Sequence, residues 1–449
     1  MAEQNGSWWQ SLLGKLGSTP NPSASTASTP TTSPEEAQAY EDIRRSLEIV
    51  FQQADPEPEP PVAASRPTIT SAAPTEIARS SVASAPTTRA AVIPVSRAGQ
   101  LLNLPDPKGV PRYTITGRVW PSTLGEASIC MWKDDKLAAF SLSIDDNHIQ
   151  DHPFWTQLCN EFGFRVTWFL IGNKLGWQNE TWVIWQNLLN AGYDVQSHGY
   201  SHLCDAMFNT QREYKQSIDV MTDNLKNAQV VTHAYPFGFK ANKVGSQCEC
   251  IKTQNDRTEA AKYFLAARDV IGAISAINKI DFMAVPSISN MRNFFNSAIT
   301  FAYFDSVLDH NNKINYRAWY CGHMHNLPDQ ATKDSVRQVF QHLKKRSADV
   351  WVGTFTQVAK YAQEFATAKI TSLALQGKQI RFEVKDQMYD GWFNMPLTIK
   401  IRLDTSWGTN LKAVQNGKIM PVRVINNAGV PYALVDAIPD AGIVTVTPA

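Results

Sequence analysis

Two adjacent aspartates, Asp145 and Asp146, stand directly after an apolar run in the stretch SIDDNHIQDH. Two histidines four positions apart, His198 and His202, follow the strand-like start of the segment YDVQSHGYSH further along the chain. Two imidazoles and one carboxylate, with positions left for water and substrate, form a common hydrolytic zinc site. Asp146, His198 and His202 therefore predict a divalent metal site, with Zn²⁺ as the expected ion. Asp145 is then free to accept a proton from water.

A third polar cluster, His323 and His325, ends the strand-like segment YRAWYCGHMH at 316–325. All three clusters lie at the C-terminal ends of predicted strands, which is the edge where a parallel α/β barrel forms its active site. The two histidines have the same parity on their strand, so both can face the barrel interior or its mouth. The residue nearer the C-terminal end lies closer to the metal, so we predict that His325 is the general acid.

The elements that must position these residues alternate between strands and helices from Leu137 onward. Strand-like segments occur at 137–144, 166–172, 193–202, 230–238, 265–270, 316–325 and 349–355. Amphipathic, helix-like segments occur between them, at 152–163, 182–192, 211–228, 256–264 and 334–346, with a last helix ending near Ala368. This alternation predicts an α/β fold with a mostly parallel sheet.

After Lys369 the pattern changes to short alternating strands separated by Asn, Gly and Asp. This pattern predicts an accessory antiparallel β-sandwich over residues 370–449. Trp392, Phe393 and Trp407 belong either to its core or to a surface that stacks on sugars. A packing or oligomerisation role is equally open, so the sequence leaves a homo-oligomer possible.

Residues 1–105 are predicted to form a disordered, low-complexity tether. Ser, Thr, Pro and Ala dominate residues 18–97, and such a composition buries too little apolar surface to offset the entropy of ordering. Two short segments, 8–16 and 33–54, have the apolar spacing of amphipathic helices. They either dock on a larger assembly or have no partner. The N-terminal sequence does not have the pattern of a conventional signal peptide.

Composition limits the partners that we expect. The 42 basic and 41 acidic side chains nearly cancel, so no overall field favours nucleic acid or an anionic membrane. No run reaches the roughly 18 apolar residues that span a bilayer. The six cysteines match neither a paired zinc-knuckle pattern nor a dense disulfide framework, although Cys248 and Cys250 leave a redox or metal pair open.

Over about residues 135–368 the chain resembles the polysaccharide deacetylases of carbohydrate esterase family four. The first family motif, Thr-Phe-Asp-Asp-Gly, resembles Ser143 to Asn147, and the second, His-(Ser/Thr)-x-x-His, resembles His198 to His202. The resemblance implies a distorted (β/α) barrel over residues 106–369. It also implies metal-dependent removal of acetyl groups from the N-acetylated sugars of a polysaccharide, with Asp145 as the base and His325 as the acid.

The third family motif, Arg-x-Pro-(Phe/Tyr), is only partly present in AYPFG at 234–238. The proline and the aromatic residue remain, and the resemblance implies that the backbone N–H of Phe237 donates to the developing oxyanion. The arginine that steadies the catalytic aspartate in the family is missing. We predict that Arg268 replaces it, the alternative being that Arg268 is a surface residue. The fourth motif, of the Asp-x-x-Asp-Trp type, is not found.

Other functions remain open at this point. The same metal chemistry would serve an esterase that removes O-acetyl groups from a polysaccharide. The missing arginine also allows a catalytically degenerate barrel that only binds carbohydrate, or a structural component. Since such enzymes act on envelope or extracellular glycans, we expect the protein to be extracellular or carried on a particle such as a phage virion. An unusual secretion route or a cytoplasmic oligosaccharide substrate would also fit.

Overall fold

The computed structural model describes residues 115–175, 180–203, 210–238, 254–270, 272, 274–289 and 298–449. The chain divides into two compact units, 1–90 and 91–449, and every described residue belongs to the second. The predicted tether, its two helices and the pair Cys248 and Cys250 lie outside the described residues. The cysteines that the structure does describe, Cys130, Cys159 and Cys321, are buried free thiols.

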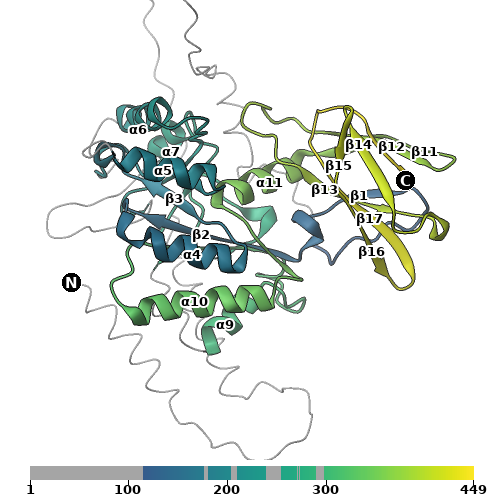
Figure 1. Ribbon diagram of the computed structural model, residues 1–449, viewed down its shortest axis with the longest axis horizontal. Coiled ribbons are helices and arrows are strands. Elements are labelled where there is room, and N and C mark those ends of the chain that lie inside the picture. Colours follow the sequence, from purple (N-terminus) through teal and green to yellow (C-terminus); the bar gives the residue numbers. More distant parts are fainter. Residues whose placement is uncertain are drawn as a thin grey trace, which may run out of the picture. The chain divides into compact units, whose positions relative to one another are not determined.

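A mostly parallel sheet forms the centre of the part of the chain that precedes residue 369 (Figure 1). Its strands run in the order β6-β5-β4-β3-β2-β9, and each pairs in parallel with its neighbour. The bounds are β2 Ala138–Asp145, β3 Thr167–Leu170, β4 Asp194–Ser197, β5 Thr232–Ala234, β6 Ala266–Arg268 and β9 Trp319–Met324. Two further strands lie at its margins: β10, Val350–Val352, parallel to the start of β2, and β7, Ile274–Ser275, antiparallel to β9.

The segment 282–289 closes this sheet into a barrel. Val285 donates its N–H to the carbonyl of Ala267 over 2.8 Å, and Asp269 donates to the carbonyl of Val285 over 2.8 Å. Three residues on, β8, Ile288–Ser289, pairs in parallel with β9. The same segment thus joins β6 on one side and β9 on the other. The distorted (β/α) barrel expected from the sequence is confirmed, although neither β7 nor β8 was predicted.

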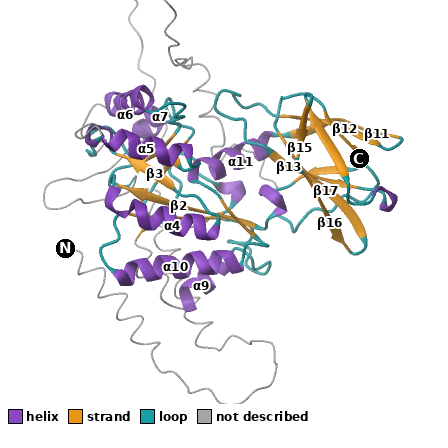
Figure 2. Cartoon of the chain, viewed as in Figure 1, coloured by secondary structure: helices purple, strands orange, loops and turns teal. Residues whose placement is uncertain are grey.

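Helices cover the outside of the sheet (Figure 2). They are α4 His152–Phe162, α5 Glu180–Asn190, α6 Thr210–Asn224, α7 Gln254–Ala260, α9 Ala298–Asp305, α10 Gln330–Lys345 and α11 Phe355–Thr367. Helix α10 buries Val336, Val339, Phe340 and Leu343, the spacing of a single helix face. Asp329 caps its start by accepting a hydrogen bond from the N–H of Thr332.

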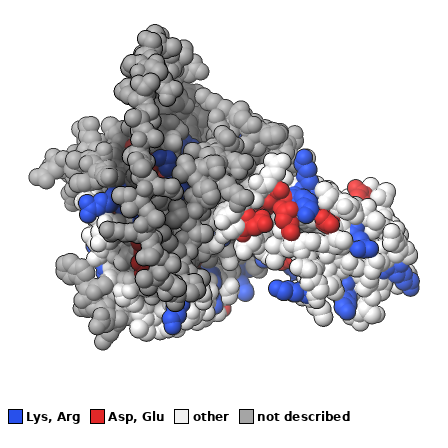
Figure 3. Space-filling view, turned by 90° about the horizontal axis from the view of Figure 1, so that it is seen from above, with Lys and Arg blue, Asp and Glu red and all other residues white. Residues whose placement is uncertain are grey.

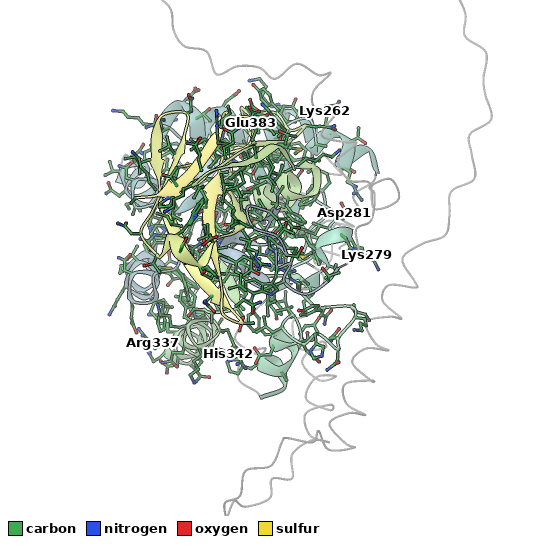
Figure 4. All side chains as sticks on the ribbon, turned by 90° about the vertical axis from the view of Figure 1, so that its right-hand side faces the viewer. Lys262, Lys279, Asp281, Arg337, His342 and Glu383 are labelled. Carbon is green, nitrogen blue, oxygen red and sulfur yellow. The ribbon has the colours of Figure 1, made fainter. Side chains whose placement is uncertain are left out.

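Ion pairs tie α10 to the neighbouring helices (Figure 4). Arg337 contacts Glu161 of α4 over 2.6 Å, and Nε2 of His342 contacts Asp305 of α9 over 2.8 Å. Both pairs are partly exposed, so each contributes at most about 1 kcal/mol and mainly fixes how the helices lie against each other.

Two antiparallel sheets form the C-terminal part, as predicted. The first has the order β1-β13-β17-β16, and the second has the order β11-β12-β18-β14-β15. The first comprises Ala127–Ile129, Leu397–Arg402, Val430–Ala437 and Val422–Asn427, and the second comprises Lys369–Gln376, Gln379–Lys385, Val444–Pro448, Leu411–Gln415 and Lys418–Met420. Apolar side chains of both sheets share one core. Trp392, Phe393 and Trp407 are buried in that core, which excludes the alternative that they form a sugar-stacking surface.

Strand β1 was not expected in this part of the fold. It precedes the barrel in sequence and lies within the range assigned to the catalytic domain, yet Ser128 pairs with Lys400 of β13 in an antiparallel register. Tyr361 of α11 adds a second link, because its hydroxyl donates to the carbonyl of Cys130 and accepts from the N–H of Thr398. The domain boundaries at 105 and 369 stay a prediction. The pairing of β1 with β13 joins residues on the two sides of the boundary at 369.

Charges on the described surface are mixed. On the face seen in Figure 3, one group of acidic side chains lies together, while lysine and arginine are scattered. Within the described residues, no helix combines the length and the apolar character that a membrane span requires.

A buried carboxyl group, Glu364 of α11, makes stability depend on pH. Burial raises its pKa to about 9, and Oε2 has no hydrogen-bond partner among the described residues. Because the pKa in the folded state lies above the ordinary value, the folded state binds the proton more tightly. The contribution of Glu364 to stability is therefore fully present below about pH 4.5 and is lost by up to about 1.4 kcal/mol per pH unit as the pH rises towards 9. We expect Glu364→Gln to flatten this slope.

Urea unfolding at several pH values measures that slope for the wild-type protein and the variant. Glu383→Gln on β12 is the matched control, because the Glu383 side chain is partly exposed and should leave the slope unchanged. Identical slopes in wild type and Glu364→Gln would show that Glu364 ionises as readily in the folded state as in the unfolded chain.

Candidate metal centre and active site

The polar residues predicted from the sequence meet at the C-terminal edge of the barrel sheet. Asp145 is the last residue of β2, and Asp146 follows it. His198 follows β4, and Arg268 is the last residue of β6. His323 lies within β9, opposite Ser143 of β2. Because these strands are parallel neighbours around one barrel, residues far apart in sequence reach the same edge.

Three of them form a cluster that suits a metal ion. One ligand atom from each of Asp146, His198 and His202 lies within 4.8 Å of the other two. Nε2 of His202 is 3.3 Å from Oδ1 of Asp146, and Nε2 of His198 is 3.6 Å from the same oxygen. Both imidazoles therefore direct Nε2 towards one carboxylate oxygen.

The chemistry of this donor set fits a divalent cation. Oδ1 of Asp146 is buried, and it has no hydrogen-bond donor in the part of the chain that the structure describes. Burial lowers the pKa of His198 well below its usual range and also lowers the pKa of His202. Both rings are therefore neutral near pH 7, the form in which imidazole binds a metal. Nδ1 of His198 lies 2.8 Å from the carbonyl of Ala234, which fixes that nitrogen as the donor and leaves Nε2 free to coordinate.

Four non-glycine residues at this edge have left-handed backbone. The φ angles are 71° at Asp146, 56° at Asn147, 54° at His202 and 64° at Phe237. Non-glycine residues rarely adopt such angles, and they do so most often at functional sites. Asn147 tolerates the conformation, and its side-chain amide bonds both backbone groups of Ile171 after β3. This explains how Asn147 replaces the usual glycine of the first motif.

Glu213 holds the loop between His198 and His202, and we did not predict it from the sequence. One carboxylate oxygen accepts the N–H of Ser201 over 2.7 Å, and the other accepts its hydroxyl over 3.0 Å. Glu213 is buried and belongs to α6. In the sequence of an amphipathic helix, a buried glutamate that binds a loop looks the same as a solvent-exposed glutamate.

Arg268 lies against Asp145, the predicted base. Nη2 of Arg268 forms an ion pair with Oδ2 of Asp145, and both side chains are buried. The alternative that Arg268 is a surface residue is therefore wrong. The other oxygen of Asp145, Oδ1, has no hydrogen-bond partner among the described residues. Arg268 thus orients the carboxylate of Asp145 by binding one of its two oxygens.

His325 and Phe237 lie at the rim of the same site. Nε2 of His325 is 3.8 Å from Oδ2 of Asp146, and its side chain is 41% exposed. The ring of Phe237 packs edge-on against His202, with ring centroids 4.9 Å apart. Gly238 follows with φ +81°, and a Cβ there would lie 2.3 Å from Cγ2 of Val270. Only glycine therefore fits the turn that carries the Phe237 N–H.

His323 is buried behind this rim. Its Nδ1 lies 2.7 Å from Oγ of Ser287, and Nη1 of Arg268 donates to the same oxygen over 3.0 Å. Sequence reasoning missed Ser287. A serine in a short segment between poorly patterned stretches gives no sign that it will reach two site residues.

Comparison with known proteins agrees with this arrangement. A family model described as polysaccharide deacetylase matches residues 134–250. A gellan lyase from Bacillus sp is 28% identical over 356 residues, which make up 73% of this chain and 14% of that protein. The chain therefore spans only a small part of the length of this relative.

Two solved structures are similar to about half of the chain. A family 4 carbohydrate esterase from Streptomyces lividans in complex with acetate is 14% identical, with a TM-score of 0.34, over 49% of this chain and 93% of its own. A CE4 esterase from Streptococcus mutans is 16% identical, with a TM-score of 0.34, over 50% of this chain and 87% of its own.

The matched residues 134–250 include Asp145, Asp146, His198 and His202, whereas Arg268 and His325 lie beyond them. The barrel sheet brings both groups to one edge. Residues 134–250, which carry the first four of these residues, match the model of the polysaccharide deacetylase family.

Proposed function

We propose that this protein is a metal-dependent hydrolase that removes acetyl groups from N-acetylated sugars of a polysaccharide. The observation that carries the proposal is the placement of Asp145 beside the cluster of Asp146, His198 and His202. Oδ2 of Asp145 is 3.9 Å from Nε2 of His198. A proton acceptor thus lies next to the atoms that would hold the ion.

Each residue has a separate task in this proposal. A divalent ion held by Asp146, His198 and His202 would polarise the acyl carbonyl and make water acidic. Asp145 accepts the proton of the attacking water as the general base. The N–H of Phe237 donates a hydrogen bond to the oxyanion that develops on the acyl carbon.

The half-exposed His325 supports an amide substrate. An amine leaves an acyl centre readily only when it is protonated, so amide hydrolysis needs a positioned acid. His325 is the exposed histidine beside the metal cluster, and a sugar at the rim can reach it. The O-acetyl esterase and the non-catalytic binding protein remain the alternatives that an assay must separate.

The direct test is acetate release from two substrates, an N-acetylated chito-oligosaccharide and an O-acetylated xylan, with Zn²⁺ present. The proposal expects release from the first and little from the second. Release from the xylan alone would identify an esterase. Binding without release from either substrate would identify a catalytically degenerate domain. Asp145→Asn is the negative control for contaminating hydrolase.

The choice of acid gives a separate prediction. We expect His325→Ala to keep its metal and to lower kcat by about 100-fold or more, since it removes the proton donor. His323→Ala should have the milder effect on kcat, after correction for the folded fraction. Both variants are assayed side by side on the N-acetylated substrate. The reverse ranking would make His323 the acid.

The location of the protein also remains our proposal. The Ser, Thr, Pro and Ala composition of residues 18–97 supports a tether that carries the enzyme on a particle or outside a cell. A particle that attacks surface polysaccharide, such as a phage virion, would use such an arrangement.

A further inference from the structure

Ser287 lies at the centre of a buried hydrogen-bond network that the proposed chemistry does not yet use. Its side chain is fully buried, in the segment that closes the barrel between β6 and β9. Its Oγ contacts three groups: the carbonyl of Asp269 at 2.6 Å, Nδ1 of His323 at 2.7 Å and Nη1 of Arg268 at 3.0 Å. One hydroxyl thus joins the partner of Asp145 to a histidine of the site.

The hydrogens of this network can be assigned by elimination. A serine hydroxyl has one hydrogen to donate and two lone pairs that accept. The carbonyl of Asp269 can only accept, and two oxygens 2.6 Å apart need a hydrogen between them, so Ser287 donates there. The guanidinium of Arg268 can only donate. Ser287 therefore has no hydrogen left for His323 and must accept one from it.

This assignment fixes the tautomer of His323. Its Nδ1 carries the hydrogen that Ser287 accepts, so in the neutral ring Nε2 carries a lone pair. Burial, followed by the charge of Arg268, lowers the pKa of His323 well below its usual range, in agreement with a neutral ring. His323 can therefore accept a hydrogen bond but cannot serve as an acid in this state.

We propose that Ser287 is a positioning residue of the active site, which holds Arg268 against Asp145 and fixes His323 as an acceptor. The kinetic part of this inference rests on the proposed function, whereas the tautomer does not. Without Ser287, Nη1 of Arg268 keeps only a 3.4 Å contact with the carbonyl of Asp269. The guanidinium then loses one of the side-chain bonds that set its orientation, while its ion pair with Asp145 remains, and the His323 ring is free to change tautomer.

The first experiment reads the tautomer of His323 directly. Nitrogen NMR of the full-length protein labelled with ¹⁵N-histidine distinguishes Nδ1–H from Nε2–H. The His323 signals are those missing from His323→Asn. We expect the Nδ1–H form alone in the wild-type protein and a mixture, or the Nε2–H form, in Ser287→Ala. The measurement needs no substrate, so it decides the tautomer even if the protein releases no acetate.

Ser141→Ala is the matched control. Ser141 is also a fully buried serine, and its Oγ accepts from Nε1 of Trp319 and contacts Sγ of Cys321. Its loss removes a buried hydroxyl of the same barrel without touching Arg268 or His323. We expect the control to leave the His323 signals and kcat unchanged.

The second experiment measures the effect of positioning on turnover. Ser287→Ala should lower kcat by roughly 10- to 100-fold, the size of effect that a small misplacement of a reacting group produces. KM and bound metal should stay near wild type, since neither substrate-binding atoms nor metal ligands change. Ser287→Thr, which keeps the hydroxyl, should recover part of kcat.

Three results would overturn the proposal. One is the Nε2–H form of His323 in the wild-type protein, a result that needs no variant to fold. Another is an unchanged His323 signal in folded Ser287→Ala. The last is a kcat for Ser287→Ala equal to that of Ser141→Ala in an enzyme that does release acetate.

Discussion

Replacing His198 with alanine is expected to weaken the binding of Zn²⁺ by about 100-fold or more and to abolish hydrolysis with it. His198 is the most buried of the three proposed ligands, and its Nε2 lies near both aspartates. Losing it leaves one imidazole and one carboxylate, a two-point site that a divalent ion leaves readily. Metal content after dialysis, measured by mass spectrometry, checks the loss independently of activity.

His152→Ala controls for the removal of a buried histidine. The His152 ring packs edge-on against Trp168 and Trp185, and neither ring nitrogen has a hydrogen-bond partner among the described residues. We expect this variant to keep its metal despite a comparable loss of packing. If folded His198→Ala bound as much zinc as the wild-type protein, His198 would not be a ligand and the proposed metal centre would be wrong.

Replacing Asp145 with asparagine is the second large effect. We expect kcat to fall by roughly 100-fold or more, the size of a general-base contribution, while bound metal stays near wild type. The metal stays because Asp146, His198 and His202 are unchanged. Kinetics on the N-acetylated substrate, together with metal analysis of the same sample, measure both parts.

Asp145→Asn also leaves the buried guanidinium of Arg268 without its counter-charge, which destabilises a folded protein. The double variant Asp145→Asn with Arg268→Met removes both charges and separates the two effects. It should recover thermal stability but not activity. Turnover close to wild type in Asp145→Asn would mean that another group takes the proton.

Much of the barrel follows from local patterns that a sequence displays. The strands β2, β3 and β9 are largely apolar runs, and the intervening helices have clear apolar faces, so both could be located. The segment 282–289 could not, because its pairing depends on backbone groups of β6 and β9 rather than on its own composition. Short strands of two residues have no periodicity to detect.

The site divides in the same way. Asp146, His198 and His202 occur at spacings that the chemistry of a metal requires, so their types alone indicated a site. Arg268 was predicted only because the arginine of the third family motif is missing and another cationic side chain had to replace it. Ser287 acts through its position between the buried side chains of Arg268 and His323. A serine in the sequence does not show which residues it will contact in the folded protein.

The pairing of β1 with β13 limits how this protein can be divided or recombined. A chain cut near residue 369 would keep β1 and α11 but lose the strand to which both are joined. The buried ion pair between Asp135 and Lys400, 2.6 Å apart, would be broken at the same place, leaving a charge without its partner. The β-sandwich is thus not an independent domain that could be replaced by a different one. Any transplant of the catalytic barrel to a new host chain must include both sheets.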